Sequence, residues 1–461
     1  MAVTIAAIFL SWATIWGRRV QKNPDVKLGA APLVGQWKFR PSIGYLMPIG
    51  LALLVIVVIP RVFARLGTIW VVLSTVVLTG AFTAALAGAD GSVAMLKPVV
   101  HPTEYWYWLD KFPPVRQMLA VYDEYDFIVN FGTHIKGHPP GYVLVLKALA
   151  TVGLAKPWII ASLSYMSAGI VAGSVLVVAN RFGSAKHTRK AAPFLILAPY
   201  AVWMGTSADA LFSALVALGA AGIAVALTSA QEHPARRIGV CVLAGLALGA
   251  GFYSSWGTVT CGPIIIAALW CGSASTTTAG HQSNHPSPLV ALLKRLRTVA
   301  PVVLFVAGGI AVTGVLMTSL GYNWFAGIGL TRRLYWKGTA QFRPWKYFMV
   351  GNLGSLVFAL GAVAVIGIGA LGVGRIRNRS VVTDSLSDDG VGWLRAFVLA
   401  GLVCALAANF SQYSKGEVER IWLPFLPWLT LPAALLLRHR FWIVLQASTA
   451  IGLQVMLISK W

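Results

Sequence analysis

Residues 89–141 read ADGSVAMLKPVVHPTEYWYWLDKFPPVRQMLAVYDEYDFIVNFGTHIKGHPPG, a long polar stretch in a chain that is otherwise strongly apolar. Six of the 14 acidic residues lie in it, at Asp90, Glu104, Asp110, Asp123, Glu124 and Asp126. Three of the eight histidines lie in it as well, at His101, His134 and His138. Ionisable groups are scarce in membrane proteins and tend to mark functional positions. We therefore expect the chemistry of the protein in this loop and a scaffold in the rest of the chain.

The composition predicts a polytopic membrane protein of the all-α class. Of the 461 residues, 57% are hydrophobic and only 11% are charged, and the mean hydropathy is +0.73. Soluble domains do not have this balance. The apolar runs predict about 12–14 helices, several of them too short to cross a bilayer core of ~30 Å. These runs are 43–60, 67–88, 142–155, 157–180, 192–206, 209–229, 238–254, 257–271, 299–320, 347–372, 394–410, 421–436 and 440–458.

The net charge of +23 does not indicate a nucleic-acid partner. The basic residues form short clusters between apolar runs, the pattern that sets membrane orientation and attracts anionic lipids. Five such clusters are expected on the cytoplasmic side, at 181–190, 234–237, 294–297, 375–379 and 438–440. Basic residues near the polar loop could instead bind an anionic substrate.

The crossings between these five clusters predict which segments share the other side of the membrane. They place 206–209, 321–346 and 411–420 together, away from the basic clusters. Loop 89–141 joins them if 142–155 and 157–180 together cross only once. The helix after HPPG should then be short or re-entrant.

The N-terminal part conflicts with this topology. Residues 17–42 carry six basic residues against one acid, which predicts a cytoplasmic position. Two full crossings, at 43–60 and 67–88, would then return the catalytic loop to the cytoplasm. Either one early span does not cross, or the charge count is misleading here.

We expect three parts along the chain. They are an N-terminal helix with a cytoplasmic segment at 1–42, a transmembrane core at 43–320 that contains the catalytic loop, and C-terminal transmembrane helices with substrate-binding loops at 321–461.

The first candidate motif is PTEYWYWLD, which carries Glu104 and Asp110. A spacing of six does not share a helix face, but in a loop both carboxylates could point into one cavity. Such a carboxylate can act as a general base that removes a proton from an attacking hydroxyl group. The aromatic residues between them could anchor the segment at the membrane interface or stack on a sugar. The alternative is a surface helix with solvated acids.

The second candidate motif is THIKGHPPG, where Pro139 and Pro140 fix a tight entry into an apolar helix. It places His134, Lys136 and His138 at the start of that helix, where a phosphate group would be favoured. The alternative is a turn that only begins a helix, with His138 as its cap.

These motifs together resemble the GT-C superfamily of membrane glycosyltransferases, which use polyprenyl-phosphate sugars. TEYWYWLD followed by GHPPG is similar to actinobacterial integral membrane members of that group, as are TSADALFSAL at 206–215 and KGEVERIWLPFLPWL at 415–429. The resemblance implies a GT-C type core with an extracytoplasmic catalytic loop. The acid that heads the family's usual Asp-Glu pair is replaced by Thr103, so Glu104, Asp110 and Asp90 all remain candidates for the base.

The third candidate site consists of basic residues expected outside the cytoplasm, at 331–346 and 414–422. If the donor is a polyprenyl phosphate, Arg332, Arg333, Lys415 and Arg420 could hold its phosphate oxygens. The alternatives are an ion pair within the protein, such as Arg420 with Glu417, or contact with lipid headgroups.

The resulting hypothesis is a glycosyltransferase of the plasma membrane that moves a pentose or mannose sugar from a polyprenyl-phosphate donor to a hydroxyl acceptor in a cell-envelope glycan or glycolipid. The catalytic candidates are Glu104, Asp110 and His138. The candidate substrate-binding residues are Asp90, His134, Lys136, Asp209, Arg332, Arg333, Lys415, Glu417 and Arg420. The alternative is a polyprenyl-phosphate or lipid transporter without a chemical step.

No cofactor is clearly indicated by the sequence. There is no P-loop or dinucleotide fingerprint, and the four cysteines lie in or beside apolar runs without CxxC spacing. A divalent metal could bind among the clustered carboxylates and histidines, but no ligand spacing requires one.

Overall fold

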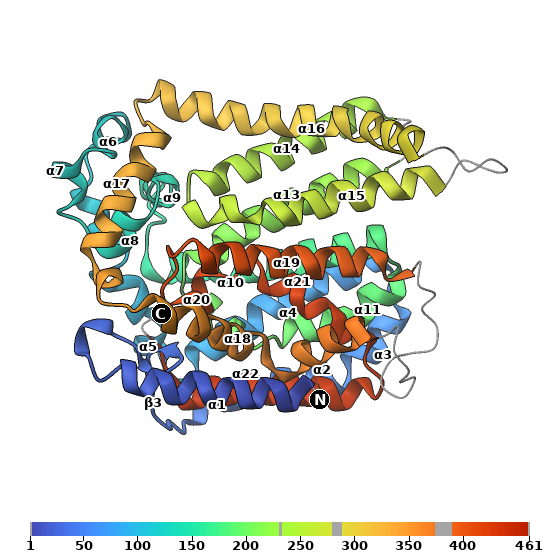
Figure 1. Ribbon diagram of the computed structural model, residues 1–461, viewed down its shortest axis with the longest axis horizontal. Coiled ribbons are helices and arrows are strands. Elements are labelled where there is room, and N and C mark those ends of the chain that lie inside the picture. The colour runs from blue at the N-terminus through green and yellow to red at the C-terminus, as the bar shows by residue number, and fades with distance from the viewer. Residues whose placement is uncertain (1, 230–232, 279–287, 374–389, 460–461) are drawn as a thin grey trace.

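The computed structural model describes residues 2–229, 233–278, 288–373 and 390–459. The described chain is almost entirely helical, and its long helices lie roughly along one direction (Figure 1). The helices are α1 (Ala2–Val20), α2 (Leu46–Val57), α3 (Ile59–Arg65), α4 (Thr68–Gly88), α5 (Ser92–Val100), α6 (Val115–Val121), α7 (Tyr125–Ile128), α8 (Thr133–Gly137), α9 (Gly141–Thr151), α10 (Pro157–Phe182), α11 (Ala185–Ile196), α12 (Ala201–Met204), α13 (Asp209–Thr228), α14 (Pro234–Phe252), α15 (Gly262–Thr278), α16 (Pro288–Ser319), α17 (Trp324–Lys337), α18 (Trp345–Val373), α19 (Gly392–Phe410), α20 (Val418–Ile421), α21 (Leu426–Thr430) and α22 (His439–Met456).

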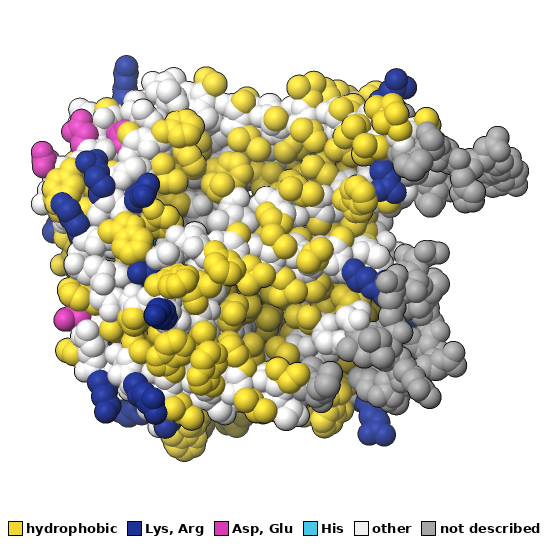
Figure 2. Space-filling model, in the orientation of Figure 1, with side chains coloured by type: hydrophobic (Ala, Val, Ile, Leu, Met, Phe, Trp, Pro, Cys, Tyr) yellow, Lys and Arg dark blue, Asp and Glu magenta, His cyan; other side chains and the backbone are white. Residues whose placement is uncertain are grey.

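The protein is an all-α polytopic membrane protein, as predicted. Among the described residues, eight helices are long and apolar enough to cross a membrane, and the bent pair 43–57 and 59–65 could form a ninth span. The eight are 68–88, 157–182, 209–228, 234–252, 256–274, 289–319, 345–372 and 392–410. Figure 2 shows hydrophobic side chains over the middle of one face and lysines and arginines at both ends. This is the surface that a bilayer requires.

The helix after HPPG is short, which confirms that expectation. Helix α9 has 11 residues, so it is only about 16 Å long and cannot cross the bilayer core. The chain beyond it stays near the polar loop, because Trp106 Nε1 donates a hydrogen bond of 2.7 Å to the carbonyl oxygen of Ala155. Helix α9 and helix α10 therefore make a net single crossing.

The polar segments gather at one end of the helices, which we call the loop end. Thr331 of α17 contacts the carbonyl oxygen of Lys136 in loop 89–141 at 3.4 Å. Tyr335 of the same helix donates a hydrogen bond of 2.9 Å to the carbonyl oxygen of Gln412. The predicted grouping of 89–141, 321–346 and 411–420 is confirmed by these contacts.

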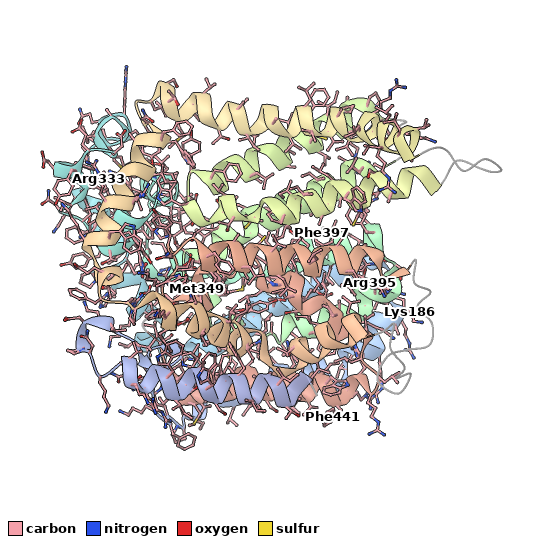
Figure 3. The ribbon with its side chains drawn as sticks, viewed as in Figure 1. Lys186, Arg333, Met349, Arg395, Phe397 and Phe441 are labelled. Atoms are coloured by element: carbon pink, nitrogen blue, oxygen red, sulfur yellow. The ribbon has the colours of Figure 1, made fainter. Side chains whose placement is uncertain are left out.

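The basic connectors lie at the opposite end, which we call the connector end. Figure 3 labels Lys186 and Arg395 there and Arg333 at the loop end. His439 contacts the carbonyl oxygen of Lys190 at 3.0 Å, and Arg189 donates to the carbonyl oxygen of Leu66 at 2.9 Å. The connector at 375–379 lies outside the described residues.

The N-terminal segment does not follow its charge count. Its two short antiparallel pairs are β1 (Gly29–Ala30) with β2 (Leu33–Val34), and β3 (Gln36–Trp37) with β4 (Leu457–Ile458). Arg40 forms an ion pair with Asp90 in the polar loop. Residues 17–42 thus lie at the loop end, and the two early crossings return the chain to that same end. The basic residues of this segment therefore lie at the end opposite the basic connectors, so the two charge patterns assign opposite ends to the cytoplasm.

The polar loop is packed around a hydrophobic cluster that it shares with neighbouring helices. Phe112 and Phe131 stack with ring centroids 4.4 Å apart, and Met118, Leu119 and Ile135 are fully buried. The same cluster includes residues of α16 and α17. A packed loop holds its polar side chains in defined positions, which a solvated loop would not do.

Candidate active site

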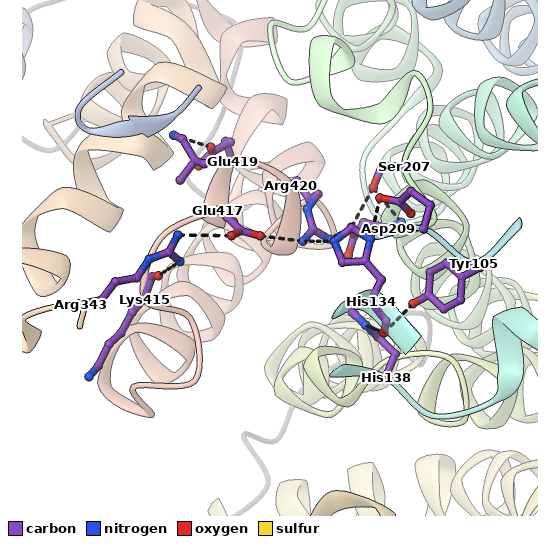
Figure 4. A network of polar contacts seen from close by, with 12 residues as sticks. Tyr105, His134, His138, Ser207, Asp209, Arg343, Lys415, Glu417, Glu419 and Arg420 are labelled. Carbon is purple, nitrogen blue, oxygen red and sulfur yellow. Dashed lines mark hydrogen bonds and ion pairs between the residues drawn. The ribbon is translucent and has the colours of Figure 1, made fainter. Parts of the chain in front are cut away.

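Five predicted residues from four separate segments meet in one polar network at the loop end (Figure 4). It begins at Glu104, whose Oε1 lies 2.6 Å from His134 Nδ1. It continues from His134 Nε2 to Arg420 Nη2 at 3.2 Å. Arg420 then pairs with Asp209 at 2.5 Å and with Glu417 at 2.9 Å. Sequence positions more than 300 residues apart, 104 and 417, are thereby joined through side chains.

Local backbone contacts hold the first pair. The backbone N–H of His134 donates to the carbonyl oxygen of Thr103 at 3.2 Å, and Tyr105 OH donates to the carbonyl oxygen of His134 at 3.4 Å. Glu104 and His134 are 9% and 7% exposed. One backbone hydrogen bond and one tyrosine side chain therefore hold the backbone of His134 beside the segment that carries Glu104.

The partners of His134 determine where its ring proton lies. A guanidinium group can only donate hydrogen bonds, so His134 Nε2 accepts from Arg420. In that neutral form the remaining ring proton is on Nδ1 and points to Glu104. The imidazole thus donates to the carboxylate and keeps one of its oxygens in place.

Arg420 is surrounded by acidic groups. Its Nη1 donates to Asp209, which begins α13 and also accepts from Ser207 Oγ at 2.7 Å. Both side chains of this ion pair are 6% exposed. A carboxylate at the first residue of a helix is further stabilised by the helix dipole. Of the alternatives for Arg420, the ion pair with Glu417 is the one that forms, and Asp209 extends it.

Glu417 lies between two arginines. Its Oε1 is 3.4 Å from Arg343 Nη2, and its Oε2 is bound by Arg420. Burial alone would raise the pKa of this carboxyl group, but the charges of Arg420 and Arg343 outweigh burial and lower the pKa to about 2. Glu417 is thus ionised at any physiological pH.

His138 lies beside the network. Burial lowers its pKa to about 4, so the ring is neutral near pH 7. Its Nδ1 lies 2.8 Å from the carbonyl oxygen of His134. A carbonyl oxygen can only accept, so Nδ1 carries the proton and Nε2 keeps a free lone pair.

The last residue of the HPPG motif, Gly141, lies too close to its neighbours to carry a side chain. A Cβ atom there would lie 2.4 Å from the carbonyl oxygen of Tyr253 and 2.5 Å from Ser254 Oγ. The backbone N–H of Gly141 donates to that same carbonyl oxygen at 2.6 Å. Only glycine permits this approach, which docks the start of α9 against the end of α14.

Two small pockets lie at the loop end, and each is lined by residues of the polar loop. The first is lined by Glu104, Tyr105, Trp106 and mainly apolar residues. The second includes Lys136, His138 and Thr331 in its lining. The rings of His134 and His138 lie 6.3 Å apart, and His138 itself lines the second pocket.

The other predicted residues lie away from the central network. Asp90 pairs with Arg40 and accepts from Tyr45 OH at 3.3 Å, so it fastens the N-terminal segment. Asp110, Arg332 and Arg333 are exposed. Lys415 is 8% exposed, and its Nζ lies 4.4 Å from the centre of the Trp336 ring.

Three residues of this region were not selected from the sequence. Arg343, Ser207 and Glu419 are all buried here. All three stood inside segments that the sequence did single out, at 331–346, 206–215 and 415–429. Burial of an arginine near the membrane surface has no signal in a single sequence, because the partners come from distant segments.

The described residues contain no group of three or more histidines, cysteines, aspartates or glutamates arranged to hold a metal ion. The four cysteines are buried free thiols, without a disulfide between them. The residues that could position a phosphate or a sugar are thus the charged and polar side chains above.

Comparison with protein-family models and with curated proteins finds no match. Among solved structures, the Archaeoglobus fulgidus oligosaccharyltransferase in complex with Zn and sulfate is similar, with 13% identity, a TM-score of 0.41, and coverage of 84% of this chain and 53% of that chain. The archaeal oligosaccharyltransferase AglB from Archaeoglobus fulgidus, in complex with an inhibitory peptide and a dolichol-phosphate, has 12% identity, a TM-score of 0.26, and coverage of 83% and 50%. The chain spans about half the length of these structures. Likeness at these TM-scores supports no conclusion about what this chain binds or transfers.

Proposed function

We propose that the protein is a membrane glycosyltransferase of the GT-C type. It transfers a sugar of the pentose or mannose class from a polyprenyl-phosphate donor to a hydroxyl group of a cell-envelope glycan or glycolipid. The single observation that carries this proposal is the Glu104–His134 pair, a buried carboxylate held by an imidazole at 2.6 Å and lining a pocket. Buried ionisable pairs at a pocket are typical of catalytic groups.

Glu104 is the proposed general base. The acceptor oxygen forms a bond to the anomeric carbon of the sugar while Glu104 takes the proton of that hydroxyl group. The bond between the anomeric carbon and the phosphate oxygen breaks, and polyprenyl phosphate leaves with the electron pair. His134 donates from Nδ1 to Oε1, which leaves the other carboxylate oxygen of Glu104 to receive the proton.

The donor phosphate is proposed to bind at the second pocket, which is lined in part by α8. Lys136 lines the second pocket together with Thr331, the first residue of the predicted basic segment. Arg332 and Arg333 follow directly on α17 and are exposed. Arg420 is occupied by Asp209 and Glu417, so we assign it to the arrangement of the site and not to the phosphate.

The active site is proposed to be extracytoplasmic, because the positive-inside pattern assigns the connector end to the cytoplasm. A lipid-linked donor can reach such a site from within the bilayer without a nucleotide pocket. A second candidate, a transporter of the same lipid, has no need for a buried carboxylate paired with an imidazole.

The test is a transfer assay with the purified protein in lipid nanodiscs. Polyprenyl-phosphate pentose and mannose donors are offered with hydroxyl acceptors, and released polyprenyl phosphate and glycosylated acceptor are measured. We expect both products in equal amounts with wild type and neither with Glu104→Gln. Movement of donor across vesicle membranes without release of polyprenyl phosphate would support the transporter and contradict the proposal.

A further inference from the structure

Arg343 forms the far end of the polar network and connects three segments. Its Nε donates to the carbonyl oxygen of Val26 at 3.0 Å. Its Nη1 donates to the carbonyl oxygen of Lys415, and its Nη2 lies 3.4 Å from Glu417 Oε1. The side chain is 8% exposed. One buried guanidinium group therefore joins the N-terminal segment to the turn that carries Glu417.

That turn has an unusual backbone. Gly416 has a φ of 83° and Glu417 a φ of 63°, and a glutamate rarely adopts this left-handed conformation. A Cβ atom at Gly416 would lie 3.1 Å from Arg343 Nη1. The turn is thus packed closely on Arg343, and Asn352 Oδ1 accepts from the Gly416 N–H at 3.0 Å.

Glu417 links this turn to the polar network, because it binds both Arg343 and Arg420. One of its oxygens binds Arg343 and the other binds Arg420 (Figure 4). The Arg420 nitrogen that Glu417 holds, Nη2, is also the one that donates to His134. A shift of Glu417 would therefore change the hydrogen bond that determines the tautomer of His134.

The N-terminal segment is itself held by hydrogen bonds to α20 and α18. Val34 donates its backbone N–H to Glu419 Oε1 at 3.0 Å, and Ser355 Oγ donates to the carbonyl oxygen of Pro32 at 3.0 Å. These contacts keep the N-terminal segment against α18 and α20. They explain how a backbone carbonyl at Val26 can hold Arg343 in place.

We propose that Arg343 is a positioning residue. Held by Val26, it sets Glu417 against Arg420 and thereby keeps the His134 proton directed at Glu104. For its effect on catalysis the inference rests on the proposed function, while the link between Arg343 and Glu417 does not depend on it.

A double-mutant cycle tests the link, with Arg343→Gln, Glu417→Gln and the double variant in the full-length protein. Arg343→Gln should lower kcat roughly ten- to hundred-fold and change the donor KM less, because the loss is in the alignment of the base. When Glu417→Gln is already present, adding Arg343→Gln should lower kcat by less than about two-fold. Losses that multiply would overturn the inference.

A conservative variant distinguishes positioning from charge. Arg343→Lys keeps the charge, but a single ammonium group cannot hold three acceptors in a fork geometry. We expect its kcat to stay near that of Arg343→Gln. Recovery to within about two-fold of wild type would contradict a positioning role. Arg189→Gln is the matched control, since Arg189 also donates to a backbone carbonyl but lies on α11 at the connector end (Figure 1). The kcat of this variant should be unchanged.

The thermal midpoints of the same variants test the link between Arg343 and Glu417 separately from the proposed transferase function. If wild type shows no transfer with polyprenyl-phosphate donors, the proposed function fails. The shifts in thermal midpoint of the two single variants and the double variant then still test whether Arg343 and Glu417 are coupled. Non-additive shifts support it, and additive shifts overturn it.

Discussion

Glu104 and Asp110 were equivalent candidates in the sequence, and burial separates them. Glu104 is 9% exposed and paired, whereas Asp110 is exposed. A buried carboxylate in a fixed orientation is a better base than a solvated one that must be desolvated and aligned at each turnover.

The first prediction concerns this base. Glu104→Gln should lower kcat by ~10²–10⁴ because an amide cannot take the proton, while its carbonyl oxygen still accepts from His134 and preserves the fold. The measurement is single-turnover transfer, with the thermal midpoint as a check on folding. Glu124→Gln, an exposed acid in the same loop, is the control. A rate loss in Asp110→Asn with none in Glu104→Gln would move the base to Asp110.

The second prediction concerns Glu419, which is fully buried next to the network. Burial raises its pKa to about 7, above the value of about 4.3 in an unfolded chain. Between these values the folded state retains the proton and the unfolded state does not, so stability should fall as pH rises from about 4.5 to 7. Glu419→Gln should remove this loss, which is about 3–4 kcal/mol for a shift of this size.

Thermal midpoints at pH 5 and pH 8 measure this effect. From pH 5 to pH 8, the thermal midpoint of wild type should fall by more than that of Glu419→Gln. The same fall in both proteins would show that another group is responsible. Glu124→Gln again serves as a control, because its carboxylate is exposed.

At the scale of elements, α8 is only five residues long, yet it carries His134 of the polar network and Lys136 of the second pocket. It gains its position from its neighbours, because a helix of this length has no stability of its own. Gly141 docks α9 behind it, and Thr331 of α17 contacts its last turn.

The third prediction tests this docking. Gly141→Ala should destabilise the protein by about 1–3 kcal/mol, because its Cβ would overlap the Tyr253 carbonyl oxygen at 2.4 Å. Gly137→Ala is the matched control, with no atom within 4 Å of its added Cβ. Thermal midpoints of the two variants give the comparison. Equal midpoints would mean that the contact with α14 adjusts without cost.

The fourth prediction concerns the phosphate region on α8 and α17. Lys136→Gln should weaken the donor by about 1.5–3 kcal/mol, which is roughly ten- to a hundred-fold, if Lys136 binds a diester phosphate. Arg332→Gln and Arg333→Gln distinguish phosphate binding from headgroup contact. The latter costs about 1 kcal/mol per residue and depends on the anionic lipid content.

Titration of a donor analogue in neutral and in anionic nanodiscs measures these affinities. Lys186→Gln at the connector end is the control and should leave the donor affinity unchanged. Unchanged affinity in Lys136→Gln, Arg332→Gln and Arg333→Gln alike would exclude this region as the phosphate site.

At the scale of the whole molecule, the two ends of the helices differ in what they carry. The loop end holds the acid-rich loop, the N-terminal segment and the polar network, and the connector end holds the basic clusters (Figure 3). This separation allows a catalytic site on one side of a membrane and orientation signals on the other.

The fifth prediction concerns this orientation. Single cysteines introduced at Lys111 and Lys38, both exposed at the loop end, should react with an impermeant maleimide on intact cells. A cysteine at Lys186 should react only after permeabilisation. The four native cysteines are buried and should contribute little background. Reaction at Lys186 without permeabilisation would reverse the proposed orientation.

The sequence by itself determined the class of the protein and the segments that matter. Hydropathy is a local property, so apolar runs predicted the helices, and the scarcity of acids in lipid drew attention to residues 89–141. The motif segments at 104–110, 134–141, 206–215 and 415–429 were all found before their contacts were known. Five residues of the central network came from them.

Only the tertiary structure decided which of these residues act together. Ion pairs between Arg420 and Asp209, and between Arg343 and Glu417, join positions that are 211 and 74 residues apart. Packing placed the basic N-terminal segment at the loop end, opposite the basic connectors, where Arg40 pairs with Asp90. Burial and pairing depend on distant segments meeting in space, and a single sequence records which groups are present but not which of them meet.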